Sequence, residues 1–127
     1  MGRQIYFDMK DGTTKDYTVI TFQMPSVNYV RITEISLFPD SSFSSYGKFN
    51  IIVAGNTQFE TPKTLKSGYT IDTSKFKSIV KLPDGREVEG LVLAPNEKIE
   101  IPIWSDGTNQ ITLSVGIVGE LLWIFQK

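Results

Sequence analysis

The stretch of sequence that decides the fold is "EKIEIPIWSDG", residues 97–107, in which every second residue from 99 to 103 is isoleucine. A period of two is typical of a β-strand with one buried face. The opposite face carries Glu100, Pro102 and Trp104. Because proline donates no backbone hydrogen bond, the strand either lies at a sheet edge or turns the Pro102 nitrogen away from the ladder. A tryptophan aimed away from the core indicates a contact with something else.

The rest of the chain has the same character, with short runs of β-branched and aromatic residues between turn signals such as Asp-Gly. Such residues favour strands, and no window shows the apolar spacing of a long helix. We therefore expect about eight strands and no long helix. The expected strands are residues 3–9, 16–22, 28–38, 49–55, 76–82, 88–94, 98–104 and 111–125.

Turn signals also predict how neighbouring strands connect. The segment "MKDGTTKDY" predicts an N-terminal hairpin over about residues 3–22. The segment "KLPDGREV" predicts a second, tight hairpin with its turn at Pro83-Asp84-Gly85. The run 49–55, "FNIIVAG", is apolar on both faces, so we expect it to be a central strand.

One expected strand, residues 28–38, contains an irregularity. Its apolar residues occupy even positions up to Ile32 and odd positions from Ile35 onward. An extra residue in one strand of a pair shifts the side chains that follow to the other face. The sequence therefore predicts a β-bulge near Thr33-Glu34.

The overall pattern predicts the fold class. With 127 residues, the chain suits one domain, residues 1–127. Short strands joined by turns predict an all-β fold, specifically an antiparallel two-sheet β-sandwich. The strand number is jelly-roll-like, since a jelly roll has about eight strands. An Ig-like sandwich is the alternative, although the Cys-Trp-Cys signature of antibody-type domains is missing.

Composition excludes several classes of function. Thirteen basic and fourteen acidic residues give a net charge of −1, so we expect no nucleic-acid partner. Cysteine and histidine are both missing, which excludes disulfides, thiolate metal sites and nucleophiles activated by histidine. No apolar run approaches the ~20 residues of a membrane helix. The sequence thus predicts no enzyme, no cofactor and no membrane partner.

Carboxylates are the remaining candidates for chemistry. Glu87 and Glu89 flank Val88 and have the spacing of a glycosidase pair, but such alternation is also typical of a solvated strand face. Asp106 and Asn109 offer oxygen ligands for calcium, but a hairpin turn accounts for them without a metal. We expect no catalytic residue and no metal site.

The C-terminal run 111–125 has fifteen residues, which would extend ~50 Å at ~3.3 Å per residue. Since ordinary strands are shorter, we expect Gly116 and Gly119 to bend or break it. Its end, "ELLWIF", is apolar on both faces. A two-layer sandwich covers only one face of each strand, so the other face needs a partner, and an identical copy is the simplest candidate.

We therefore predict a homo-oligomer and an interface formed by outward or doubly apolar residues. These are Trp104, Leu122, Trp123, Ile124 and Phe125. The alternative is a carbohydrate-binding module, in which exposed tryptophans and tyrosines stack on sugar rings.

Two segments resemble small β-sandwich or jelly-roll structural proteins of viruses, of the capsid-decoration, minor-capsid or fibre-head type. They are "VRITEISLFPDSSFSSYGKFNIIVAG" and "LVLAPNEKIEIPIWSDGTNQITLSVGIVGEL", and the resemblance covers roughly residues 28–55 and 91–121. It implies a non-enzymatic building block that assembles symmetrically, contacts a larger shell protein and resides in the virion after assembly in the host cytoplasm. It transfers no functional residues to this chain.

Overall fold

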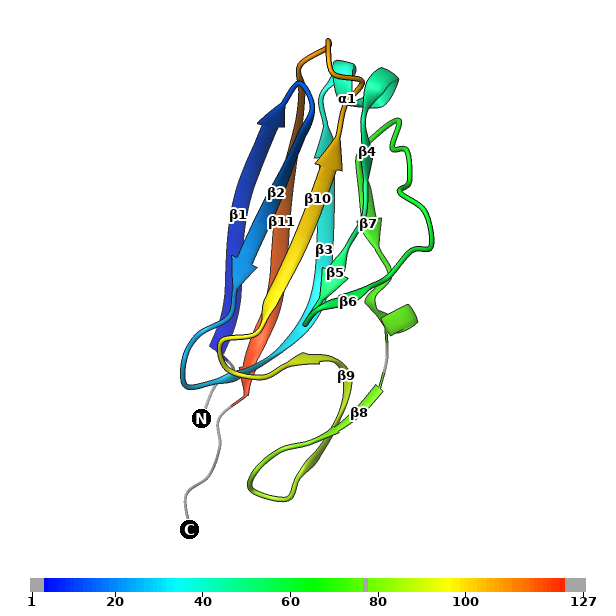
Figure 1. Ribbon diagram of the computed structural model, residues 1–127. Coiled ribbons are helices and arrows are strands. Elements are labelled where there is room, and N and C mark those ends of the chain that lie inside the picture. The colour runs from blue at the N-terminus through cyan, green and yellow to red at the C-terminus, as the bar shows by residue number, and fades with distance from the viewer. Residues whose placement is uncertain (1–3, 77, 123–127) are drawn as a thin grey trace.

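The computed structural model describes residues 4–76 and 78–122, which form two antiparallel sheets packed face to face (Figure 1). Sheet A has the order β1-β11-β3-β9-β8, with β7 also paired to β3. Its strands are β1 (Gln4–Thr14), β3 (Tyr29–Pro39), β7 (Tyr69–Ile71), β8 (Ser78–Lys81), β9 (Glu87–Leu93) and β11 (Ile111–Leu122). Sheet B has the order β2-β10-β5-β6, with β4 also paired to β10. Its strands are β2 (Tyr17–Gln23), β4 (Lys48–Phe49), β5 (Ile52–Val53), β6 (Asn56–Thr57) and β10 (Lys98–Trp104).

The strand pairing is nested, and this nesting identifies the jelly roll among β-sandwiches. The first strand pairs with the last (β1 with β11), β2 pairs with β10, β3 with β9, and β5 with β6. A jelly roll arises when one long folded-over ribbon of paired strands is wound into two sheets. The predicted two-sheet antiparallel sandwich is therefore confirmed, in its jelly-roll form rather than the Ig-like one.

The core lies between the two sheets and is almost wholly aliphatic and aromatic. The isoleucines at 99, 101 and 103, which predicted the strand, are all fully buried on β10. Leu113, Val115 and Ile117 of β11 in sheet A are also fully buried and belong to the same core cluster. The period of two therefore correctly predicted the inner face of the central strand.

The neighbours of β10 decide between the two interpretations of Pro102. The strand lies between β2 on one side and β4 and β5 on the other, so the sheet-edge interpretation is wrong. The Asn50 amide donates to the Pro102 carbonyl over 3.1 Å, and the N and C=O of one strand residue point to the same side. The Pro102 nitrogen therefore faces the gap between β4 and β5, where no ladder bond is lost.

The prediction of one continuous central strand over residues 49–55 is wrong, and the side chain of Asn50 explains why. Its Oδ1 accepts from the amides of Ile51 at 2.8 Å and Phe59 at 3.2 Å, and its Nδ2 donates to the Phe59 carbonyl at 3.1 Å. On the side away from β10, these side-chain bonds take the place of backbone pairing, while the Asn50 amide still donates to the Pro102 carbonyl. The segment consequently splits into β4 and β5.

The expected hairpin over residues 3–22 does not form, because β1 and β2 belong to different sheets. Their connection is instead tied to the loop that follows β10. The carbonyls of Lys15 and Asp16 accept from the amides of Gly107 and Ser105 at 2.9 and 2.8 Å. The turn therefore carries the chain from one sheet to the other. The second predicted hairpin, β8–β9, is confirmed, with Gly85 at a φ of +92° in its turn.

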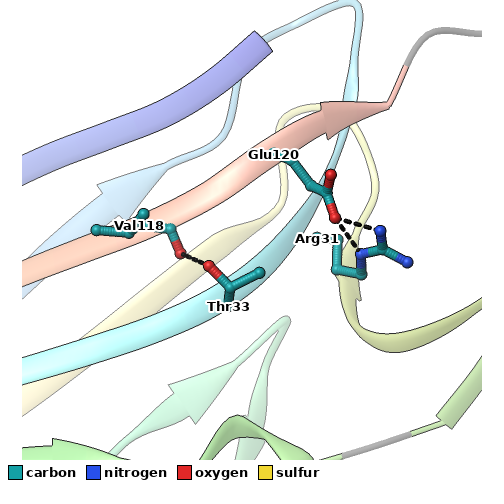
Figure 2. A network of polar contacts seen from close by, with 4 residues as sticks. All are labelled: Arg31, Thr33, Val118 and Glu120. Atoms are coloured by element: carbon teal, nitrogen blue, oxygen red, sulfur yellow. Dashed lines mark hydrogen bonds and ion pairs between the residues drawn. The ribbon is translucent and has the colours of Figure 1, made fainter. Parts of the chain in front are cut away.

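The predicted bulge near Thr33-Glu34 is confirmed. Along β11, Val118 pairs with Glu34 while the next residue, Gly119, pairs with Ile32, which leaves Thr33 as the extra residue. The Thr33 hydroxyl donates to the Val118 carbonyl over 3.1 Å (Figure 2). The expected break in the C-terminal run is absent up to Leu122, because the irregularity lies in β3 and not in β11.

Two short helical segments were not predicted. The helix α1 (Ser41–Tyr46) begins at Asp40, whose carboxylate accepts from the Phe43 amide over 2.7 Å as an N-cap. Phe43 is fully buried, so this single turn closes one end of the core. The 3₁₀ turn η1 (Thr73–Phe76) precedes β8. Both are too short to give a periodic sequence signal.

Candidate interaction surfaces

Three exposed apolar side chains of sheet A form a row on the outer face of β1, which we call the β1 row: Ile5, Phe7 and Met9. Their exposed fractions are 73%, 62% and 52%. The alternate residues point inward, where Tyr6 packs against the core and the Lys10 ammonium lies 5.8 Å from the centre of the Phe22 ring. The β1 row was not among the interface residues predicted from the sequence.

The β1 row continues sideways onto β11 and ends at a charged pair. Phe7 pairs with Val118, and Ile5 pairs with Glu120. The Arg31 guanidinium reaches across from β3 to the Glu120 carboxylate, with Nε at 2.7 Å (Figure 2). An apolar centre with a polar rim is the usual anatomy of a protein–protein contact.

Trp104 lies on the outer face of sheet B, as its parity predicts, but it is only half-buried and not isolated. It sits directly opposite Tyr17 of β2, with ring centroids 5.3 Å apart and the ring planes tilted by 42°. On its other side it pairs with Lys48 of β4. Cross-strand aromatic pairs stabilise a sheet by ~0.2–1 kcal/mol, so the Tyr17–Trp104 pair stabilises sheet B whether or not it binds a ligand.

The predicted C-terminal interface is only partly described. Leu121 packs against the core, while Leu122 lies on the opposite face of β11 and pairs with Tyr29 of β3. Leu122 is half-buried. The alternation of faces predicted for this segment therefore holds at these two residues. Trp123, Ile124 and Phe125 lie outside the described residues.

The structure places the two carboxylates of the suggested glycosidase pair on an exposed strand. Glu87 and Glu89 are exposed on β9, while Val88 between them is half-buried. Glu87 pairs with Lys81 across the β8–β9 hairpin. This arrangement matches a solvated strand face.

The carboxylate of Asp106 is used by the turn that contains it. Its oxygens accept from the Thr108 amide at 2.9 Å, the Asn109 amide at 2.8 Å and the Asn109 side chain at 2.6 Å. The hydrogen bonds from Asn109 and Thr108 lower the pKa of Asp106 below its ordinary value. The expected hairpin is wrong here, because β10 and β11 belong to different sheets, and these residues instead form the turn of the loop that joins the sheets. Over residues 4–76 and 78–122 no cluster of metal-ligating side chains is found.

This lowered pKa predicts a pH dependence. Because the folded state binds a proton at Asp106 less readily than the unfolded state, the carboxylate stabilises the fold above its unfolded pKa. That contribution is lost as pH falls through the lower, folded value. We expect Asp106→Ala to be less stable than the parent at neutral pH in urea unfolding, with the difference shrinking under strongly acidic conditions. A difference that is independent of pH would contradict this assignment.

In the described part of the chain, no helix has both the length and the apolar character needed to cross a bilayer. The fold and these surfaces together define the class of protein: a jelly-roll β-sandwich that carries an exposed apolar row on its edge strand β1.

Comparison with known proteins adds no narrower assignment. No protein family and no characterised protein matches the sequence. Among solved structures, the chain is similar to PliG of Aeromonas hydrophila, a periplasmic inhibitor of g-type lysozyme, at 14% identity and a TM-score of 0.36, over 95% of this chain and 89% of that one. It is also similar to parts of two larger proteins. These are the mosquito-larvicidal Cry4Aa toxin of Bacillus thuringiensis (16% identity, TM-score 0.34, 87% of this chain and 18% of that one) and dimeric latent PorU of Porphyromonas gingivalis (7% identity, TM-score 0.36, 93% and 13%). At these scores the likenesses carry no argument about function.

Proposed function

We propose that this chain is a non-enzymatic structural protein that associates with copies of itself and with a larger shell, as a decoration or minor component of a virion. The observation that carries the proposal is the β1 row, whose three apolar side chains are each more than half exposed. Large exposed apolar patches with polar rims mark contact surfaces.

Two further features support this proposal. The jelly roll is a recurrent fold of viral capsid proteins, although lectins and cupins share it, so the fold alone does not decide the function. The sequence contains neither histidine nor cysteine, and so lacks the commonest general base and the most nucleophilic side chain.

The proposal is tested in the particle itself. Virions purified from the source that encodes this chain should contain it in many symmetric copies beside a different shell protein, as seen by mass spectrometry and electron microscopy. Repeated absence of the chain from purified particles, with the chain abundant elsewhere in the same preparation, would refute the virion assignment.

A carbohydrate-binding module is the second candidate, and the Tyr17–Trp104 pair is the observation that favours it. Tyr17 is 51% exposed beside the half-buried indole, and aromatic faces stack on sugar rings. However, rings tilted by 42° do not form one flat platform.

We predict that the wild-type chain gives no specific signal on a glycan array, because the Tyr17–Trp104 pair is explained by sheet pairing. Trp104→Ala is the matched variant. A reproducible glycan signal that Trp104→Ala removes, with the circular dichroism spectrum unchanged, would replace the assembly proposal by the carbohydrate-binding one.

A further inference from the structure

The strand β1 has one paired edge and one open edge. Its only described ladder partner is β11, and it stands at the end of sheet A (Figure 1). The Met9 amide donates to the Asp8 side chain, its own neighbour in sequence, over 2.9 Å. In an antiparallel pair, residues with both backbone groups toward the partner alternate with residues whose groups point away. The Met9 bond therefore indicates that odd-numbered residues of β1 direct their backbone groups to the open edge.

Several of the devices that normally protect an open edge are lacking on β1. Proteins cover such edges with proline, bulges, short strands or charges. The eleven residues of β1 contain no proline, and their register with β11 runs without a shift. Charges are present at the sides of the row: Asp8 and Lys10 lie on the inward side, with Lys10 over the Phe22 ring, and Asp11 follows Met9 on the outer side. From Ile5 to Met9 the β1 row is consequently uninterrupted, beside a backbone edge on which the structure describes no second strand.

We infer that a second copy of this chain pairs with β1 through its own β1, antiparallel and centred on Phe7, so that sheet A continues across a two-fold axis. This inference rests on the proposed function and names the partner and the register of the contact. An isologous contact brings residue i to residue j and residue j to residue i. Centred on Phe7, the two rows match completely: Ile5 faces Met9 of the second copy, Phe7 faces Phe7, and Met9 faces Ile5.

The inward side chains also suit this register. Tyr6 faces Asp8 of the second copy, so a phenol meets a carboxylate, and Gln4 faces Lys10. Among these described pairs, no two like charges stand opposite each other, which would destabilise a strand pair.

Neighbouring registers fit less well. Shifting the centre to Asp8 sets two carboxylates against each other and places Ile5 opposite Asp11. Shifting it to Met9 places Phe7 opposite Asp11. Shifting it to Tyr6 removes Met9 from the matched row. The Phe7-centred register is therefore the one in which the strand is complementary to itself.

The natural lack of cysteine allows a direct test of the register by cross-linking of the full chain. Directly opposite residues in an antiparallel pair have Cα atoms ~4.5–5.5 Å apart, within the ~4.4–6.8 Å that a disulfide spans. We expect mild oxidation to convert most of the Phe7→Cys chain into a covalent dimer.

The matched variants distinguish this register from others. Ile5→Cys alone and Met9→Cys alone should stay monomeric under denaturing electrophoresis, because equal positions are offset by four residues, ~13 Å along the strand. A mixture of Ile5→Cys with Met9→Cys should cross-link between the two variants. Cross-linking of all three single variants to the same extent would show non-specific collision and overturn the inference.

The outcomes also separate this inference from the proposed function. If wild-type chains associate in sedimentation velocity but Phe7→Cys and the Ile5→Cys/Met9→Cys mixture do not cross-link, the β1 pairing is wrong while assembly through another surface stands. If the wild-type chain is monomeric at high micromolar concentration, the inference is overturned. The virion test then decides alone whether the chain is a shell component.

Discussion

Replacing Phe7 by lysine should convert the associated chain into monomers. Each dimer loses two apolar contacts at its centre and gains two ammonium groups that face each other across the two-fold axis. Fully burying one such side chain is worth ~1.5–3 kcal/mol, so the two together account for at most about 3–6 kcal/mol. Since every 1.4 kcal/mol is tenfold, the loss of affinity from this burial is at most about 10²–10⁴-fold.

The chain offers a matched control for this prediction in Ile79. It is 68% exposed on β8, the edge strand at the other end of sheet A. Ile79→Lys should leave the association constant unchanged in sedimentation velocity, and both variants should keep the β-type circular dichroism spectrum because surface substitutions alter stability little. Association that survives Phe7→Lys, or that is lost equally in Ile79→Lys, would show that the β1 row is not the contact.

Replacing Gly119 by alanine should destabilise the fold by about 1–3 kcal/mol, the usual cost of overpacking a core. A Cβ atom at this position would lie 2.6 Å from the Arg31 carbonyl oxygen and 3.3 Å from its carbonyl carbon. These are backbone atoms at the β3 bulge, so they cannot move aside as a flexible side chain can. Relief of the clash would require β3 and β11 to separate where Arg31 meets Glu120.

Gly116, three residues earlier on β11, is the matched control. A Cβ atom there would meet only Met9 Cγ, at 3.6 Å, which is an ordinary contact. Gly116→Ala should be neutral, or should stabilise the fold by about 0.4–1 kcal/mol because alanine lowers the conformational entropy of the unfolded chain. Urea unfolding of the two variants measures the difference. Equal stabilities would mean that the close approach at the bulge has no energetic consequence.

Local features of the fold could be predicted from the sequence. The alternation of Ile99, Ile101 and Ile103 identified the buried face of β10, and the change of phase after Ile32 located the bulge at Thr33. Both the buried face and the bulge follow from the spacing of apolar residues that are close together in the sequence. Spacing is a direct consequence of the side-chain period of a strand.

Features that depend on distant parts of the chain could not be predicted. The segment after β1 has ordinary turn residues, and its change of sheet is seen only in the pairing of β1 with β11 and of β2 with β10. The break at Asn50 likewise depends on the Phe59 backbone, nine residues away. Secondary-structure propensities depend on the local sequence and therefore contain no information about these strand partners or the Phe59 backbone.

The candidate site was predicted only in part. Trp104 and Leu122 lie on the faces that their parity indicates. The β1 row was missed because "IYFDM" carries apolar or aromatic residues on both faces, and because Ile5 and Phe7 look like core residues. At the open side of a sandwich the inward face of an edge strand can hold Asp8 and Lys10, whose polar ends reach past the core. The signal available in the sequence was the doubly apolar character of β1, the same signal that was applied to residues 121–125.

The most direct test of the account is sedimentation velocity of the wild-type chain over a concentration series, run beside Phe7→Lys. The account predicts that the wild-type chain shifts from the 14.3 kDa monomer toward twice that mass as concentration rises, while Phe7→Lys remains monomeric throughout. A wild-type chain that stays at the monomer mass up to high micromolar concentration, indistinguishable from Phe7→Lys, would contradict the claim that β1 is a contact between copies.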